Sequence, residues 1–310
     1  MKMSPEHEGV VLAAKKAAEQ LGIPLIVKDL QKEFKDEIID FFASEYLRGR
    51  TPSPCVRCNP RIKFKYLLQT ALENGFDHIA TGHYSKIVFE DGVYKLTFGE
   101  SVARDQSYML AGLNQDVLSR LVLPLSQLEK PLVREIAKSI GLECSDAPDS
   151  EENCFIPDND YAGFIERNYK KSEPGDFISP EGSVLGRHKG ILHYTVGQRK
   201  GLGVALGRPA YVTEIDVATN EVRLGYEKAH VGKVFVEDIS ETYEGAVKDG
   251  TRALCKLRST GKLLGCRVER KDGGAVLHLD SPTPRVSNGQ AAALYAEGFV
   301  LGNATICGGE

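Results

Sequence analysis

The chain has 310 residues, which is enough for two or three domains with cores of their own. Its 42% hydrophobic and 26% charged residues exclude a disordered or fibrous protein. The net charge of −4 excludes a global basic field, so any nucleic-acid surface must be local. We expect a cytosolic protein, because no apolar run reaches the ~18 residues of a membrane span, no secretory signal is visible, and seven cysteines suit a reducing compartment.

The first part of the chain alternates between helical and strand-like patterns. Apolar residues at helical spacing predict helices over 9–21, 34–47 and 64–72, and short apolar runs predict strands over 24–27 and 78–81. This order predicts a parallel sheet flanked by helices. The pair Asp91-Gly92 between two alternating runs predicts a hairpin over 86–98. Further helices are expected over 106–113, 116–121 and 130–140.

The pattern changes after about residue 165, where glycine and β-branched residues become frequent. Short alternating runs separated by turn-rich spacers predict a small barrel or sandwich. The expected strands are 210–215, 221–224, 233–237, 252–257, 266–269, 275–279 and 291–295. We therefore expect three domains, over residues 1–165, 166–228 and 229–310.

The segment RGRTPSPCVRCNPRIKFK, residues 48–65, carries six cations and no acidic residue. Its three prolines predict an ordered, extended loop. Neighbouring positive charge favours a thiolate, so we expect a lowered pKa that makes Cys55 or Cys58 a candidate nucleophile. The same cations could contact phosphates. Structural zinc is a weaker interpretation, because no second close pair of Cys or His residues is present.

Three other polar segments contain candidate functional residues. Cys154 stands in the polar stretch PDSEENCFIP, where its thiol should be exposed, whereas the four cysteines at 144, 255, 266 and 307 are expected in the core. In ATGHY, Gly82 follows an expected strand, at the sheet edge where parallel sheets bind ligands. His83 is equally explained as a satisfied polar residue, and Asp105 in RDQSY as a helix cap.

Five motifs in this order resemble the bacterial tRNA-specific 2-thiouridylases (the MnmA family). They are TPSPCVRCN followed by IKF, ATGHY, RDQSY, PDSEENCFIP and YTVGQRKGLG. The resemblance runs from near residue 10 to the C-terminus. It implies an α/β fold: a parallel-sheet domain like the adenine-nucleotide hydrolases, then a small central β-rich domain and a C-terminal β-barrel.

The resemblance also implies an activity. In this family ATP, with Mg²⁺, adenylates O2 of wobble uridine 34, and a cysteine persulfide then replaces that oxygen with sulfur. The implied partners are the Lys, Glu and Gln tRNAs and a cysteine desulfurase or sulfur-relay protein, with no membrane. By residue match, Cys154 carries the persulfide and Cys58 is the second nucleophile, which leaves a Cys58–Cys154 disulfide.

Further positions carry over from the same resemblance. Gly82 corresponds to a nucleotide contact. Ser53, Pro54 and Cys55 correspond to the segment that contacts the target base. The expected tRNA contacts are His83, Arg104, Asp105, Gln106, Arg258, Ser259 and Gln290. A base in a single-stranded anticodon loop suits this chemistry, because it can be splayed into a pocket.

The chain departs from the family pattern in two places. Many members have Asp where this chain has Cys55. The set Cys55, Cys58 and Cys154 instead resembles a subgroup that holds a [4Fe-4S] cluster. The sequence therefore allows two mechanisms, one with a cluster and one with a cysteine persulfide. The family's SGGxDSS loop, which cradles pyrophosphate, is not found in the sequence. We therefore expect an N-terminally incomplete first domain, and either a thiouridylase completed elsewhere or an ATP-incompetent relative that binds tRNA or relays sulfur.

Overall fold

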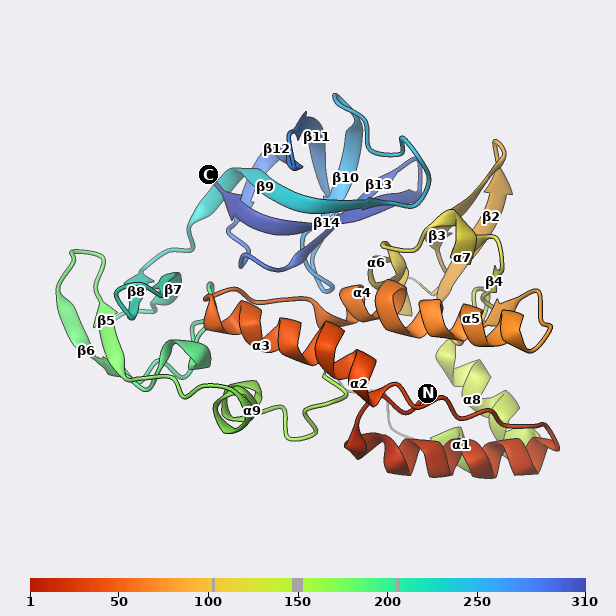
Figure 1. Cartoon of the computed structure of the whole chain (residues 1–310). Helices are drawn as coiled ribbons and strands as arrows, with labels where there is room; N and C mark the ends of the chain where they lie inside the picture. The colour runs from red at the N-terminus through yellow and green to blue at the C-terminus, as the bar shows by residue number, and fades with distance from the viewer. Residues whose placement is uncertain (102–103, 147–152, 205–206) are drawn as a thin grey trace.

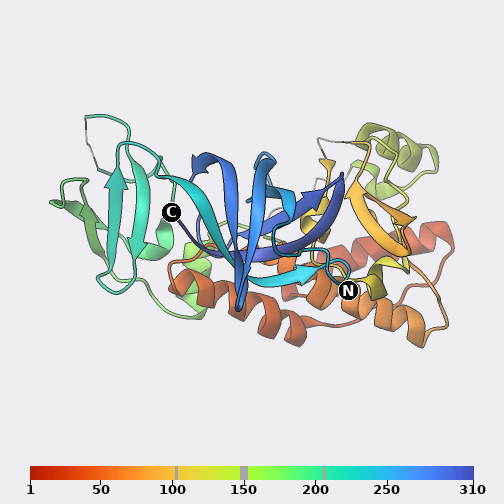
Figure 2. The same ribbon diagram turned by 90° about the horizontal axis from the view of Figure 1, so that it is seen from above.

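The structure is a computed structural model that describes residues 1–101, 104–146, 153–204 and 207–310. A helical unit runs beneath a β-barrel, and a smaller β-unit lies at one end (Figures 1 and 2). Among the described residues, no helix combines the length and the apolar character that crossing a membrane requires.

The helical unit contains two long, nearly continuous helical runs. After a 3₁₀ turn at Pro5–His7 and α1 (Glu8–Leu21), the first run joins α2 (Gln31–Phe34), a π-helical stretch (Lys35–Ile39) and α3 (Asp40–Leu47). The second joins α4 (Pro54–Cys58), a π-helical stretch (Asn59–Phe64) and α5 (Lys65–Glu73). The helices expected over 9–21, 34–47 and 64–72 are confirmed.

The second run corrects the expectation of an extended loop over 48–65. Pro54 occupies the first turn of α4, where its missing N–H leaves no helical hydrogen bond unmade. Pro60 falls in the π-helical stretch, where the regular α-helical ladder is already interrupted. Only residues 48–53 stay outside a helix, so the CxxC pair is helical.

The apolar run 24–27 is not a strand, which corrects a second expectation. Its side chains Leu25, Ile26 and Val27 are 42%, 54% and 49% exposed, and the nearest pairing is an isolated bridge between Lys2 and Asp29. A strand needs a neighbour for its backbone hydrogen bonds. No strand of the described chain lies beside this run.

The parallel sheet consists of two short strands, β1 (Ile79–Ala80) and β4 (Leu121–Val122). The sequence predicts β1 but assigns residue 121 to a helix that in fact ends at Leu118. Around the sheet lie α6 (Ser107–Leu110), α7 (Gln115–Leu118), α8 (Lys130–Ser139) and a 3₁₀ turn at Glu143–Asp146. The expected hairpin is present as β2 (Ser85–Glu90) and β3 (Val93–Phe98).

The C-terminal strands close into a barrel and not a sandwich. Their order is β13-β10-β11-β12-β9-β14, and β13 also pairs with β14. The strands are β9 (His230–Glu241), β10 (Arg252–Lys256), β11 (Leu264–Lys271), β12 (Gly274–Pro284), β13 (Ala291–Ala296) and β14 (Phe299–Gly309). Closure leaves no free edge among these six strands, and β14 also pairs with β3 at Phe299 and Thr97, which joins the β2–β3 hairpin to the barrel. Inward-facing Cys255 and Cys266 are fully buried, as expected for core thiols.

The central unit is a four-stranded sheet in the order β6-β5-β8-β7. Its elements are α9 (Tyr161–Asn168), β5 (Gly175–Ile178), β6 (Val184–His188), a 3₁₀ turn at Ile191–His193, β7 (Tyr211–Asp216) and β8 (Glu221–Gly225). The barrel and the helical unit share one apolar core, in which Val56 and Phe64 of the second helical run pack with Ala293 and Tyr295 of β13. The barrel therefore holds the helix that carries the CxxC pair.

Candidate functional site

Two segments far apart in the sequence bring three thiols together. Helix α4 carries Cys55 and Cys58, and Cys154 comes from the segment before α9. The Cys58 thiol is 5% exposed, Cys55 is half-buried and Cys154 is exposed. The charges of Cys154 and Cys55 would each raise the pKa of Cys58, and that of Cys55 would raise the pKa of Cys154, so all three interact electrostatically.

The pKa of Cys58 is shifted in the direction opposite to the sequence prediction. Burial raises it from 9.0 to about 12, and the Lys63 side chain and backbone N–H offset only part of that shift. Cys154 lies at the surface, yet the protein atoms around its thiol raise its pKa as well. The prediction fails because burial outweighs nearby positive charge, and because most of that charge is already paired.

The guanidinium groups beside the CxxC pair have carboxylate partners. Arg57 lies 3.3 Å from Glu37 Oε2, donates to its backbone carbonyl and covers the ring of Phe41. Arg61 lies 3.4 Å from the same carboxylate oxygen. Within the described chain Lys63 has no carboxylate at salt-bridge distance, and its positive charge acts on the thiols. Glu37 therefore partly compensates the charge of Arg57 and Arg61, and the expectation that the cluster contacts phosphates stays a prediction.

Arg50 joins the helical unit to the barrel. Its guanidinium lies 2.7 Å from Glu45, whose side chain is only 5% exposed, and 2.7 Å from Glu237 of β9. Gly289, with φ of +90°, brings the barrel's backbone close enough that a Cβ there would lie 3.2 Å from Arg50 Cβ. This contact fixes the segment that leads into α4.

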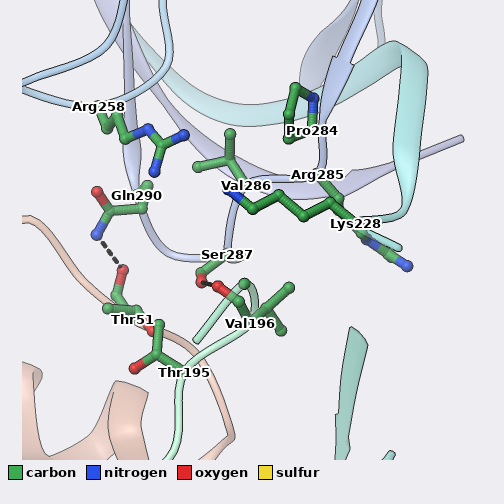
Figure 3. A pocket seen from close by; sticks show the side chains of 11 residues that line it. Thr51, Thr195, Val196, Lys228, Arg258, Pro284, Arg285, Val286, Ser287 and Gln290 are labelled. Carbon is green, nitrogen blue, oxygen red and sulfur yellow. Dashed lines mark hydrogen bonds between the residues drawn. The ribbon is translucent and has the colours of Figure 1, made fainter. Parts of the chain in front are cut away.

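A row of hydrogen bonds continues from that contact toward the thiols. Thr51 N donates to Asn288 O at 2.7 Å, and Gln290 Nε2 donates to Thr51 O at 2.8 Å (Figure 3). Ser53 Oγ accepts from Ala291 N at 3.1 Å. Two residues expected to contact RNA, Ser53 and Gln290, thus lie on either side of one junction. The side-chain nitrogen of Gln290 donates to this junction, and its side-chain oxygen can accept a hydrogen bond from RNA.

The ATGHY segment lies against the π-helical stretch Asn59–Phe64 that follows the CxxC pair. Thr81 Oγ1 and His83 Nδ1 are 2.9 Å apart, and the imidazole packs 5.6 Å from the ring of Phe64. Burial, with a smaller contribution from Lys63, lowers the pKa of His83 to about 4, so the ring is neutral near pH 7. Gly82 is exposed at the carboxyl end of β1, where a Cβ would approach only Leu125. A ligand could reach this backbone.

The RDQSY segment is held by hydrogen bonds within the fold. Asp105 accepts from both the backbone N and the hydroxyl of Ser107, at 3.3 and 2.7 Å. Gln106 Oε1 accepts from Tyr84 N at 2.9 Å, which ties this segment to ATGHY. Arg104 is exposed. The expectation that Asp105 caps this helix is wrong by one residue: Gln106 is the N-cap of α6, with no side-chain capping bond, and Asp105 accepts instead from Ser107, the first residue of the helix.

A cavity of about 230 Å³ opens where the three units meet (Figure 3). Thr51 lines it from the helical unit, Arg258 and Gln290 from the barrel, and Thr195 from the YTVGQRKGLG motif. Ser259 stands beside Arg258 in the exposed turn after β10. The other cationic lining residues, Lys228 and Arg285, were not identified from the sequence. They are far from the motifs along the chain, and no local signal marks them.

The sequence leaves a [4Fe-4S] cluster on Cys55, Cys58 and Cys154 open as an alternative to the persulfide, and the residues that the structure describes do not show one. Within the described parts of the chain, no group of three or more His, Cys, Asp or Glu side chains is arranged to hold a metal ion. Cys55, Cys58 and Cys154 interact electrostatically without forming such a group. We therefore assign no step to a cluster.

The chain matches family models of tRNA-modifying proteins in three consecutive segments. Family models match the HUP domain of the tRNA methyl transferases over residues 3–158, their PRC-barrel domain over 162–226, and an aminomethyltransferase β-barrel domain over 232–306. These matches confirm the expected α/β fold with its central unit and C-terminal barrel.

Curated relatives identify one family within this class. The chain is 42% identical to the tRNA-specific 2-thiouridylase MnmA of Lachnoclostridium phytofermentans, over 94% of this chain and 83% of the relative. It is also 42% identical to that of Carboxydothermus hydrogenoformans, over 94% and 82%. A relative named MnmA 2 from Clostridium botulinum is 50% identical over 69% of this chain and 61% of its own length. The chain belongs to the tRNA-specific 2-thiouridylase (MnmA) family.

Proposed function

We propose that this protein replaces O2 of the wobble uridine of tRNA with sulfur, at the expense of ATP. One observation carries the proposal: in a chain that belongs to the thiouridylase family, Cys58 packs in one buried cluster with Phe155 and Ile156, the residues that directly follow Cys154. Two thiols on segments that pack together suit a reaction in which sulfur is carried on one of them and released by the other.

The reaction then has two balanced stages. The uridine O2 attacks the α-phosphorus of ATP, held with Mg²⁺, and pyrophosphate leaves. The terminal sulfur of a Cys154 persulfide forms a bond to C2, and the C2–O bond breaks with AMP as the leaving group. Cys58 attacks the inner sulfur of Cys154, the S–S bond to the transferred sulfur breaks, and its electron pair stays on that sulfur. The product disulfide is then reduced by an external thiol.

The chain's own residues support this sequence through their placement. The raised pKa of Cys58 keeps its thiol protonated near neutral pH, so it stays unreactive until its proton is removed. Lys63 is the cation that favours the thiolate form of both Cys58 and Cys154. We assign the nucleotide to the backbone at Gly82 and the target base to the Ser53–Pro54–Cys55 segment.

The remaining assignments concern partners. We infer that Arg258, Ser259 and Gln290 contact the RNA from the barrel, together with His83 and the segment 104–106. The substrates are the Lys, Glu and Gln tRNAs, and a cysteine desulfurase or sulfur-relay protein loads the persulfide in the cytosol. The barrel's hydrogen bonds to residues 51–53 support this arrangement, because they join the RNA-facing and thiol-bearing segments.

The test is an anaerobic assay of the purified chain with ATP, cysteine, a cysteine desulfurase and unmodified tRNA. Mass spectrometry of the digested RNA measures 2-thiouridine at position 34. We expect Cys154→Ser to abolish the product while tRNA binding is retained. The matched control is Cys307→Ser, which removes a half-buried barrel thiol outside the proposed site and should leave product formation intact.

Each outcome has a definite meaning. Product formation by Cys154→Ser at the wild-type rate contradicts the persulfide role of Cys154. Binding of tRNA by the wild-type chain without thiouridine or AMP release favours the alternative, a relative that binds tRNA or relays sulfur without using ATP. Adding a polypeptide that carries an SGGxDSS loop to the assay separates these two, because only an enzyme would gain activity from it.

A further inference from the structure

The cavity between the three units has an uncompensated positive charge. Arg258 lies on one side of it, and Lys228 and Arg285 lie on the other (Figure 3). The remaining lining residues include no aspartate or glutamate. Three cations around a cavity of about 230 Å³ create a local positive potential in a protein whose net charge is −4.

These cations have no carboxylate partners in the described chain. No ion pair involves Lys228, Arg258 or Arg285 there, in contrast to the arginines beside the CxxC pair. Lys228 packs its ammonium 5.4 Å from the ring centroid of Tyr211, which leaves its charge uncompensated. Arg285 is fixed at its backbone, because its N–H donates to Ala229 O at 2.6 Å. Within the described chain, none of these three positive groups is therefore neutralised by a carboxylate, and the ring of Tyr211 and the backbone bond of Arg285 place Lys228 and residue 285 beside the cavity.

The cavity also offers neutral hydrogen-bond donors. Thr51, Thr195 and Ser287 line its walls, one from each of the three units, and the Ser287 hydroxyl already donates to Val196 O at 3.5 Å (Figure 3). Cations together with hydroxyls are the usual partners of phosphate oxygens. Its volume is several times the ~30 Å³ that one water molecule occupies in the liquid, so a phosphate group fits.

We propose that this cavity binds a phosphodiester group of the RNA backbone, with Arg285 and Lys228 as phosphate contacts. The proposal rests on the proposed function, since the RNA is the substrate assigned there. A backbone phosphate is favoured over a nucleotide phosphate by position. Thr51 and Gln290 join the cavity to Ser53, the expected contact of the target base, by a short row of hydrogen bonds. Gly82, where we assign the nucleotide, does not line the cavity.

Occupation of the cavity has a structural consequence. A bound phosphate would contact the central unit, the barrel and Thr51 at once, and Thr51 lies three residues before α4. The RNA backbone would therefore hold the thiol-bearing helix against the barrel while the uridine reacts. Arg285 and Lys228 are positioning residues in this scheme and do not touch the reacting atoms.

The test uses the full chain and an unmodified tRNA transcript, with affinity measured across a series of salt concentrations. One lost phosphate contact lowers the slope of log K against log [salt] by about 0.7 to 0.9, which at 0.1 M salt is a five- to eightfold loss of affinity. We expect this change for Arg285→Gln and for Lys228→Gln, and near wild-type binding for Arg285→Lys. Lys16→Gln, on the exposed face of distant α1, removes the same charge and should change neither quantity.

Three results would overturn the inference. The first is an unchanged slope and an unchanged affinity for both glutamine variants, while the wild-type chain thiolates tRNA. This result would refute phosphate binding in the cavity and leave the proposed function standing. The second is an equal loss in Lys16→Gln, which would mean a general charge effect. The third is inorganic phosphate or ATP binding, measured by calorimetry, that Arg285→Gln abolishes while tRNA binding is unchanged. If the wild-type chain fails to bind tRNA at all, the proposed function and this inference fall together.

Discussion

Alkylation of Cys58 in the native chain should be slow and should rise steeply with pH. Burial raises its pKa from 9.0 to about 12, so its thiolate fraction at pH 8 falls from about one tenth to about one part in ten thousand. The intrinsic nucleophilicity of a thiolate increases with its pKa, with a Brønsted coefficient near 0.45, which recovers about 20-fold of that loss. The net expectation is a rate about 40-fold below that of the same cysteine in the unfolded chain. Restricted access to a thiol that is 5% exposed adds to this factor.

The assay is alkylation by iodoacetamide from pH 7 to 9.5, with the labelling of each cysteine peptide followed by mass spectrometry. The chain in urea at the same pH is the reference. The native rate at Cys58 should increase about tenfold per pH unit throughout this range, whereas the unfolded rate should level off near pH 9. A native rate within fivefold of the unfolded rate, or a plateau below pH 9, would refute the conclusion that burial controls this thiol.

Two further predictions concern stability. The folded-state pKa of His83 is lowered to about 4, below the unfolded value of 6.5, so the folded protein loses stability as the pH falls. The loss between pH 7 and pH 5 should be about 2 kcal/mol in urea titrations. His83→Gln should remove this pH dependence, and an unaltered dependence would contradict the assignment. Arg50→Ala leaves Glu45 buried without its nearest cation, and we expect a loss of about 3 kcal/mol in the free energy of unfolding. A loss below 1 kcal/mol would show that the Arg50–Glu45 pair does not anchor the segment before α4.

Local patterns in the sequence were sufficient for much of the fold. Period-two alternation located most barrel strands, and Asp91-Gly92 located the hairpin, because side-chain spacing and turn geometry depend on neighbouring residues alone. The order of the five motifs was sufficient to identify the family. Strand β14 was missed, and the run 24–27 was misassigned, because strand formation depends on a partner elsewhere in the chain.

The chemical residues were visible in the sequence, but their properties were not. Cys58 and Cys154 could be named from their motifs, whereas the raised pKa of Cys58 follows from burial by residues distant along the chain. Likewise the arginines of residues 48–65 looked free, and only the fold brings Glu37 to Arg57. The sign of a pKa shift depends on what surrounds a group in three dimensions.

The sequence by itself determined the family through the order of its motifs, and its change of periodicity predicted the three-part organisation. The resemblance then supplied the two thiols that we propose for the reaction. Only the tertiary structure decided which charges are neutralised and which remain available. Lys228, Arg258 and Arg285 come from three separate connections, and no pattern along the chain relates them. Electrostatic interactions depend on distance in space, and the folding of the barrel brings these three connections to one cavity.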